Sequence, residues 1–119
     1  MLYTKHVELT DATETTLFTV PTGFHVIIKY IFVANHGGST KNASLHFAAS
    51  DGTNRVDIYD EESLSSGSRL TLGNGGGPLF VLYEGEVVKA QTEASADMEF
   101  VVTFDLEEQA PTLVNFNGS

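Results

Sequence analysis

The sequence contains no cysteine and no tryptophan, and only 6 of its 119 residues are lysine or arginine. Without cysteine, neither a disulfide framework nor a thiolate metal site can form. The 16 acidic side chains give a formal net charge of −10 with neutral histidines. A phosphate backbone and an anionic membrane face would both repel such a surface, so we expect no nucleic-acid partner and no membrane partner.

Long apolar runs are also missing. The N-terminus has no apolar core of a signal peptide, and the longest apolar stretch, residues 26–34, contains Lys29 and is too short to span a bilayer. We therefore expect a soluble protein that is made in a cytoplasm. A chain of this length suits one domain, which buries about two-thirds of its unfolded surface.

Motifs that carry chemistry are absent as well. There is no GxSxG nucleophile motif, and the glycine-rich residues 73–78 lack the Lys-Ser/Thr ending of a phosphate loop. The acidic residues 57–62 suit either a weak calcium site or a solvated acidic loop, and the loop is the simpler interpretation. We predict no catalytic site, no cofactor, no metal site and no enzymatic activity. The four histidines, none in a metal-ligand spacing, are His6, His25, His36 and His46.

Alternation with a period of two residues is the strongest structural signal that is present. In residues 97–106, Met98, Phe100, Val102 and Phe104 share one face, and polar residues occupy most of the other. A strand with one face in water explains this pattern, whereas a helix would scatter these residues around its circumference.

Turn-forming residues divide the rest of the chain into short intervals of similar character. No interval carries a helical stripe, so the fold class is all-β. We predict about nine strands in an antiparallel β-sandwich of jelly-roll type, with residues 1–106 as the domain and residues 107–119 as an extended C-terminal arm. The other expected strands are residues 2–9, 15–20, 24–35, 44–49, 55–59, 69–72, 79–83 and 86–92.

Two of these intervals are apolar on both faces. Residues 79–83 have no polar position, and residues 24–35 place Ile27, Ile31 and Val33 on one face. Either such a strand is central and covered by its own domain, or one face is buried by another copy of the chain. The opposite face of residues 24–35 is predicted to hold Val26, Ile28, Tyr30, Phe32 and Ala34.

Three segments, in this order, resemble small tailed-bacteriophage virion proteins. Residues 15–23, TTLFTVPTG, are similar to the "TLYTVPAG" hairpin of those proteins, and residues 27–35, IIKYIFVAN, to the long strand ending in "ANxxG". Residues 82–90, LYEGEVVKA, are similar to their "L-x-x-GD-x-V-x-A" hairpin. The resemblance spans much of residues 15–106, and the arm has no counterpart in it.

The resemblance implies a structural virion protein. Its members are capsid cement or decoration proteins, which bind the outer surface of the phage head, or tail-associated and fibre-adaptor proteins. The first class implies two partners, the major capsid protein and the chain itself, as a homotrimer by analogy with threefold sites on capsids. A carbohydrate-binding module is the alternative from another class, because it shares the sandwich architecture.

The arm ends in a short apolar piece beyond Pro111. Either it is a frayed terminus, or it docks on a neighbouring subunit or on the shell. We predict that the interface with other copies or with the capsid includes Ile27, Ile31, Val33, Phe80, Leu82, Leu113, Val114 and Phe116.

Overall fold

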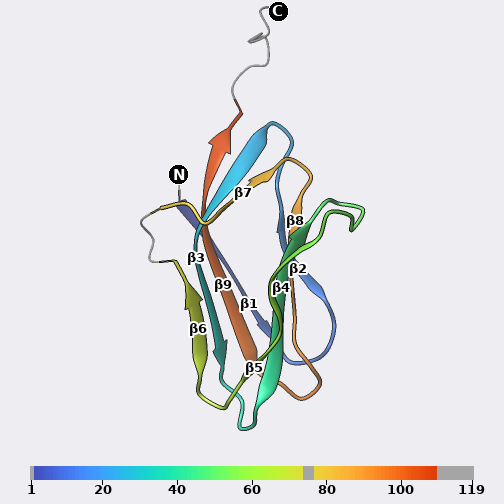
Figure 1. The fold of residues 1–119 in the computed structure, drawn as a ribbon, viewed down its shortest axis with the longest axis vertical. Coiled ribbons are helices and arrows are strands. Elements are labelled where there is room, and N and C mark those ends of the chain that lie inside the picture. Colours follow the sequence, from blue (N-terminus) through green and yellow to red (C-terminus); the bar gives the residue numbers. More distant parts are fainter. Residues whose placement is uncertain (1, 74–76, 110–119) are drawn as a thin grey trace, which may run out of the picture.

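The computed structural model describes residues 2–73 and 77–109, and these form nine strands and no helix (Figure 1). The strands are β1 (Leu2–Leu9), β2 (Thr15–Thr19), β3 (Phe24–Asn35), β4 (Lys41–Ala48), β5 (Val56–Leu64), β6 (Arg69–Leu72), β7 (Phe80–Tyr83), β8 (Val87–Gln91) and β9 (Met98–Glu108). The predicted all-β class and the expected number of strands are confirmed.

The strands form two antiparallel sheets that pack face to face. The first sheet has the order β1-β9-β3-β6, with β7 pairing beside β6 on the same strand, β3. The second sheet has the order β2-β8-β4-β5. The chain therefore resembles one long hairpin that is rolled into two layers. Its paired strands are β1 with β9, β2 with β8, β3 with β6 and β7, and β4 with β5. This is the jelly-roll arrangement that the sequence predicts.

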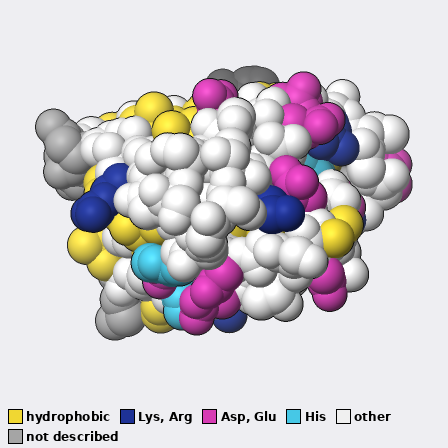
Figure 2. All heavy atoms as spheres, turned by 90° about the horizontal axis from the view of Figure 1, so that it is seen from below, with side chains coloured by type: hydrophobic (Ala, Val, Ile, Leu, Met, Phe, Trp, Pro, Cys, Tyr) yellow, Lys and Arg dark blue, Asp and Glu magenta, His cyan; other side chains and the backbone are white. Residues whose placement is uncertain are grey.

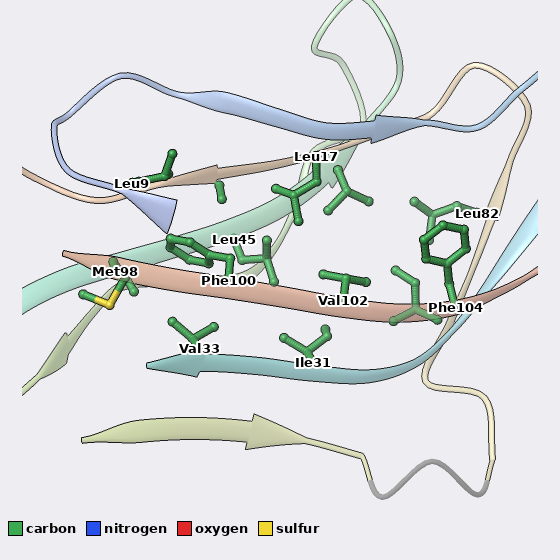
Figure 3. Close-up of a cluster of buried hydrophobic side chains, with 14 of the residues drawn as sticks. Leu9, Leu17, Ile31, Val33, Leu45, Leu82, Met98, Phe100, Val102 and Phe104 are labelled. Carbon is green, nitrogen blue, oxygen red and sulfur yellow. The ribbon is translucent and has the colours of Figure 1, made fainter. Parts of the chain in front are cut away.

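The core lies between the two sheets and is built from alternate residues of each strand. In β9, Met98, Phe100 and Val102 have exposed fractions of 0%, and Figure 3 shows them side by side facing the second sheet. The residues between them on the strand are only partly buried and point away from the core. The alternation predicted for this strand is therefore confirmed.

A bulge in β3 exchanges the two faces of that strand half-way along. Ile28 and Tyr30 pair with consecutive residues of β9, so Lys29 is an extra residue in the ladder. Simple alternation holds on each side of Lys29 but not across it, because one inserted residue shifts every later side chain to the opposite face.

The predicted grouping of residues in this strand is consequently wrong beyond Lys29. Val26 and Ile28 do face the core, but Ile31 and Val33 continue that face, with exposed fractions of 0%. Tyr30 and Phe32 point to the outside of the first sheet, on the same side as Ile27, and are half-buried.

Three strands are longer than the sequence predicts. Strand β4 begins at Lys41, three residues before its predicted start. Strand β5 continues to Leu64, so the acidic residues 57–62 lie in an exposed edge strand and not in a loop. Edge strands tolerate charged side chains, which is why their polarity gave no strand signal. Strand β9 continues to Glu108, where Glu107 and Glu108 pair with His25 and Phe24. The first two residues assigned to the arm thus belong to the sheet.

Candidate functional site

The outside of the first sheet carries apolar side chains from three strands, with polar residues such as Thr103 and Asp105 among them. Val81 pairs with Ile27 and Val101 with Phe32, so the surface crosses β7, β3 and β9. Val81 remains 43% exposed in the single chain. We call this surface the apolar outer face, and it consists of Ile27, Tyr30, Phe32, Val81, Tyr83 and Val101.

The outside of the second sheet is polar. Ser44 pairs with Gln91, and His46 pairs with Lys89, across β4 and β8. The carboxylate of Glu14 lies over this face, 3.8 Å from Nε2 of His46 and 3.6 Å from Nζ of Lys89. Among the described residues, the two outer faces of the sandwich therefore differ, because the first carries more large apolar side chains than the second.

The environment of His46 predicts that the stability of the protein depends on pH. Its side chain is only 7% exposed, and this burial, together with the positive charge of Arg55, lowers the pKa of His46 from its usual 6.5. The folded state therefore favours the neutral ring. The protein has its full stability when the pH is above the pKa that His46 has in the unfolded state, and it loses stability as the pH falls below that value. We expect His46→Gln to lose less thermal stability than the wild-type protein between about pH 7.5 and about pH 5. Equal losses in the two proteins would show that His46 does not carry this dependence.

A polar cleft lies beside the same face. It has a volume of about 280 Å³, and no residue that lines it is aromatic. Its rim includes Glu61, whose φ is 50° and whose backbone N–H donates to Oγ of Ser44 at 2.9 Å. The lining offers donors and acceptors for a hydroxylated ligand and consists of Asn42, Ser44, Arg55, Asp60, Glu61, Gln91, Thr92 and Glu93.

A second, apolar groove lies between the edge strands β1 and β2. It has a volume of about 180 Å³. The ring of Phe104 forms its floor, with the rings of Phe18 and Tyr3 stacked at centroid distances of 4.4 Å and 5.8 Å. We call it the β1–β2 groove, and it is lined by Tyr3, Lys5, Phe18, Thr19, Pro21, Val26, Phe104 and Leu106.

One carboxylate at the opposite end of the sandwich holds two histidines. The Nε2 atoms of His6 and His36 lie 2.8 Å and 2.7 Å from the two carboxylate oxygens of Glu99. The hydrogen bond from His36 lowers the pKa of Glu99, and the same bond raises the pKa of His36. Figure 2 shows histidine side chains beside acidic ones at this end. Within residues 2–73 and 77–109, no group of three or more such side chains is arranged to hold a metal ion.

The structure does not bring the predicted interface residues that it describes together on one surface. Ile31, Val33 and Leu82 are 0% exposed in the core of the single chain, so they have no surface to offer a partner. Ile27 lies on the apolar outer face, and Phe80 faces inward, its ring 5.3 Å from that of Phe47. The arm residues Leu113, Val114 and Phe116 lie outside the described residues.

Several surface residues are missing from the sequence-based set. Val81 and Tyr83 flank the buried Leu82 on β7, and alternation along that short strand would have separated them from it. Tyr30 and Phe32 required knowledge of the bulge at Lys29, for which the sequence gives no signal.

Comparison with known proteins identifies no family. No protein-family description and no curated protein matches the chain. Among solved structures, it is similar to a protein of the Bacillus endospore appendages, a family of disulfide-linked pili, with a TM-score of 0.48, 13% identity, and coverage of 92% of this chain and 89% of that one.

The chain is also similar to larger chains from infectious bursal disease virus. One, from the Gx strain, has a TM-score of 0.43 and 14% identity over 94% of this chain, and another, from the T13 particle, has a TM-score of 0.42 and 11% identity over 98% of it. This chain spans only 37% and 41% of their lengths. These values assign no function to it.

In the part of the chain that the structure describes, no helix is long and apolar enough to cross a membrane.

Proposed function

We propose that this protein is a structural virion protein of the capsid cement or decoration class, which binds the outer surface of a phage head and associates with itself. The observation that carries the proposal is the contrast between its two outer faces, one apolar and one polar. The resemblance of residues 15–35 and 82–90 to small tailed-phage virion proteins supports the same class.

Binding energy alone is enough for such a role. A cement protein bridges adjacent capsid subunits and holds the shell against internal pressure, which requires contact area and no chemistry. Burying a large apolar side chain contributes about 1.5–3 kcal/mol, so the apolar outer face is the natural contact between copies. The polar face then remains in water.

The net charge of −10 affects the two kinds of contact in opposite ways. Copies of the chain repel one another, so added salt strengthens self-association. Basic patches on a capsid shell attract the chain, so added salt weakens binding at an exposed rim. The same charge supports a position outside the head, because packaged DNA would repel the protein.

The test uses the mature heads of the phage that encodes this chain, prepared without it. Purified protein is added, and bound protein and the rupture temperature of the heads are measured. We expect saturable binding and a raised rupture temperature. Binding to purified tails but never to heads would replace this proposal with the tail-associated or fibre-adaptor role.

One observation favours a carbohydrate-binding module as a second candidate. The polar cleft beside the second sheet presents amide, hydroxyl and carboxylate groups suited to sugar hydroxyls. Calorimetry with a panel of bacterial surface glycans tests it, with Gln91→Ala as the variant. Glycan binding by the wild-type protein that Gln91→Ala abolishes would favour the module over the cement role.

A further inference from the structure

The β1–β2 groove lies at the open side of the sandwich. Among the described residues, β1 pairs only with β9 and β2 only with β8, so each strand leaves one edge free. The groove lies between these two edges, and Tyr3 at its rim is 42% exposed. Free backbone groups beside an apolar floor are the features that bind an added extended segment.

The ligand that fits such a groove is a short extended peptide with apolar side chains at alternate positions. Alternate residues of an extended segment point to the same side, so two of them can reach the floor together. The groove has a volume of about 180 Å³, which two such side chains are sufficient to fill.

Residues 110–119, outside the described residues, have this sequence pattern. Val114 and Phe116 are two positions apart and therefore share a face when extended, while Leu113 and Asn115 share the other. The segment APTLVNFNGS has no charged side chain, so it is not repelled by a surface that carries a net charge of −10.

The described part of the chain runs past its own groove before it ends at Gln109. Leu106 lines the groove, but β9 then continues past it, and the N–H of Gln109 donates to the carbonyl of Gly23 at 2.8 Å. A segment that returned to this groove would have to reverse direction after Gln109, and Pro111 favours extended conformations at Ala110. From Gln109, the seven residues to Phe116 extend up to about 25 Å.

We infer that the β1–β2 groove is the docking site for residues 110–119 of a second copy of this chain, with Val114 and Phe116 of that copy over Phe104. The inference rests on the self-association in the proposed function and adds to it a second contact, separate from the apolar outer face. Each copy offers one groove and one segment, so the contact closes either by reciprocal exchange between two copies or as a ring. A ring of three copies satisfies every groove.

Cysteine cross-linking tests the contact, because the natural chain has no cysteine. Protein with Thr19→Cys, at the exposed rim of the groove, is mixed with protein with Asn115→Cys, which keeps both apolar anchors. Thr16→Cys is the matched control, since Thr16 is an exposed threonine on the same strand that pairs with Lys89, on the polar face. We expect about ten-fold more disulfide-linked dimer with Thr19→Cys than with Thr16→Cys.

Substitutions in the segment separate specific docking from random collision. Phe116→Ser in the Asn115→Cys chain should reduce the cross-linked dimer by about ten-fold, because it removes the larger anchor. Leu113→Ser, on the opposite face, should leave the yield unchanged. Equal loss in the two variants would overturn the inference.

Two further results would overturn it and leave the proposed function intact. The first is equal cross-linking at positions 16 and 19 in an oligomeric protein that binds heads. The second is a Thr19→Cys/Asn115→Cys double variant that forms only an intramolecular disulfide, which would place the segment in its own groove. A wild-type protein that is monomeric and never binds heads would overturn the proposed function as well.

Discussion

Replacing Asn35 with alanine is expected to lower the free energy of unfolding by about 3 kcal/mol, because it leaves several buried polar groups without partners. The side chain is 1% exposed at the end of β3. Its Nδ2 donates to the carbonyls of Ser39 and Leu64, each at 2.9 Å, and its Oδ1 accepts from the N–H of Gly37 at 2.9 Å.

The backbone of Asn35 extends the same network. Its N–H donates to the carbonyl of Ser68, and its own carbonyl accepts from the N–H of Gly67, both at 2.9 Å. One residue thus joins the ends of β3 and β5 to the β3–β4 loop and the β5–β6 turn. Loss of its side chain removes the bonds that join β3, β5 and the β3–β4 loop, whereas the backbone bonds to the β5–β6 turn remain.

Asn35→Asp distinguishes hydrogen bonding from packing. The new carboxylate has nearly the same shape but faces the carbonyls of Ser39 and Leu64 with an oxygen where Nδ2 donated. We expect it to be at least as destabilising as alanine near neutral pH, with partial recovery on acidification, since a protonated carboxyl donates one bond.

Denaturant unfolding at 25 °C measures these effects. The control is Asn54→Asp, an exposed position with a φ of 55°, a conformation that aspartate and asparagine both tolerate. The control should change the free energy of unfolding by less than about 0.5 kcal/mol. A loss of under about 1 kcal/mol in Asn35→Ala would mean that water replaces the lost bonds.

The sandwich could be predicted from the sequence because its central strands are amphipathic or wholly apolar. The predicted bounds of β1, β3 and β6 agree with the structure. A turn with Gly85 at a φ of 85° does join β7 to β8, but the two strands lie in different sheets, so the hairpin expected in residues 82–90 does not form. Turn residues separate the strands clearly, and strand order follows from rolling one long hairpin.

The surface could not be predicted in the same way. A bulge such as that at Lys29 depends on the pairing of β3 with β9, which local sequence does not encode. Because the bulge exchanges the faces of β3 beyond Lys29, Ile31 and Val33 were predicted to lie at an interface but are buried in the core. His6 and His36 meet at Glu99 only through the pairing of β1 with β9 and the turn after Asn35.

The structure explains one position of the resemblance to tailed-phage virion proteins. The "ANxxG" ending of the long strand contains Asn35, and its side-chain amide ties three loop and strand ends together. A pattern in the sequence that looked like a turn signal therefore encodes a buried hydrogen-bond network.

The apolar outer face yields the second large effect. Val81→Glu is expected to weaken self-association by about a hundred-fold or more, because it removes buried apolar area and places a carboxylate in a contact between two acidic chains. Val81 is 43% exposed in the single chain, so the substitution should leave the fold of the monomer intact. Sedimentation at tens of micromolar and thermal unfolding measure the two properties separately.

The chain provides a closely matched control for this variant. Val56 is 46% exposed on β5 of the second sheet, so Val56→Glu introduces the same charge at a similar exposure on the other sheet. We expect Val56→Glu to associate as the wild-type protein does, and Val81→Glu to sediment as a monomer. Because copies that carry a net charge of −10 repel one another, added salt should strengthen the association of the wild-type protein. Equal weakening by the two substitutions would indicate general charge repulsion and remove the apolar outer face as the contact between copies.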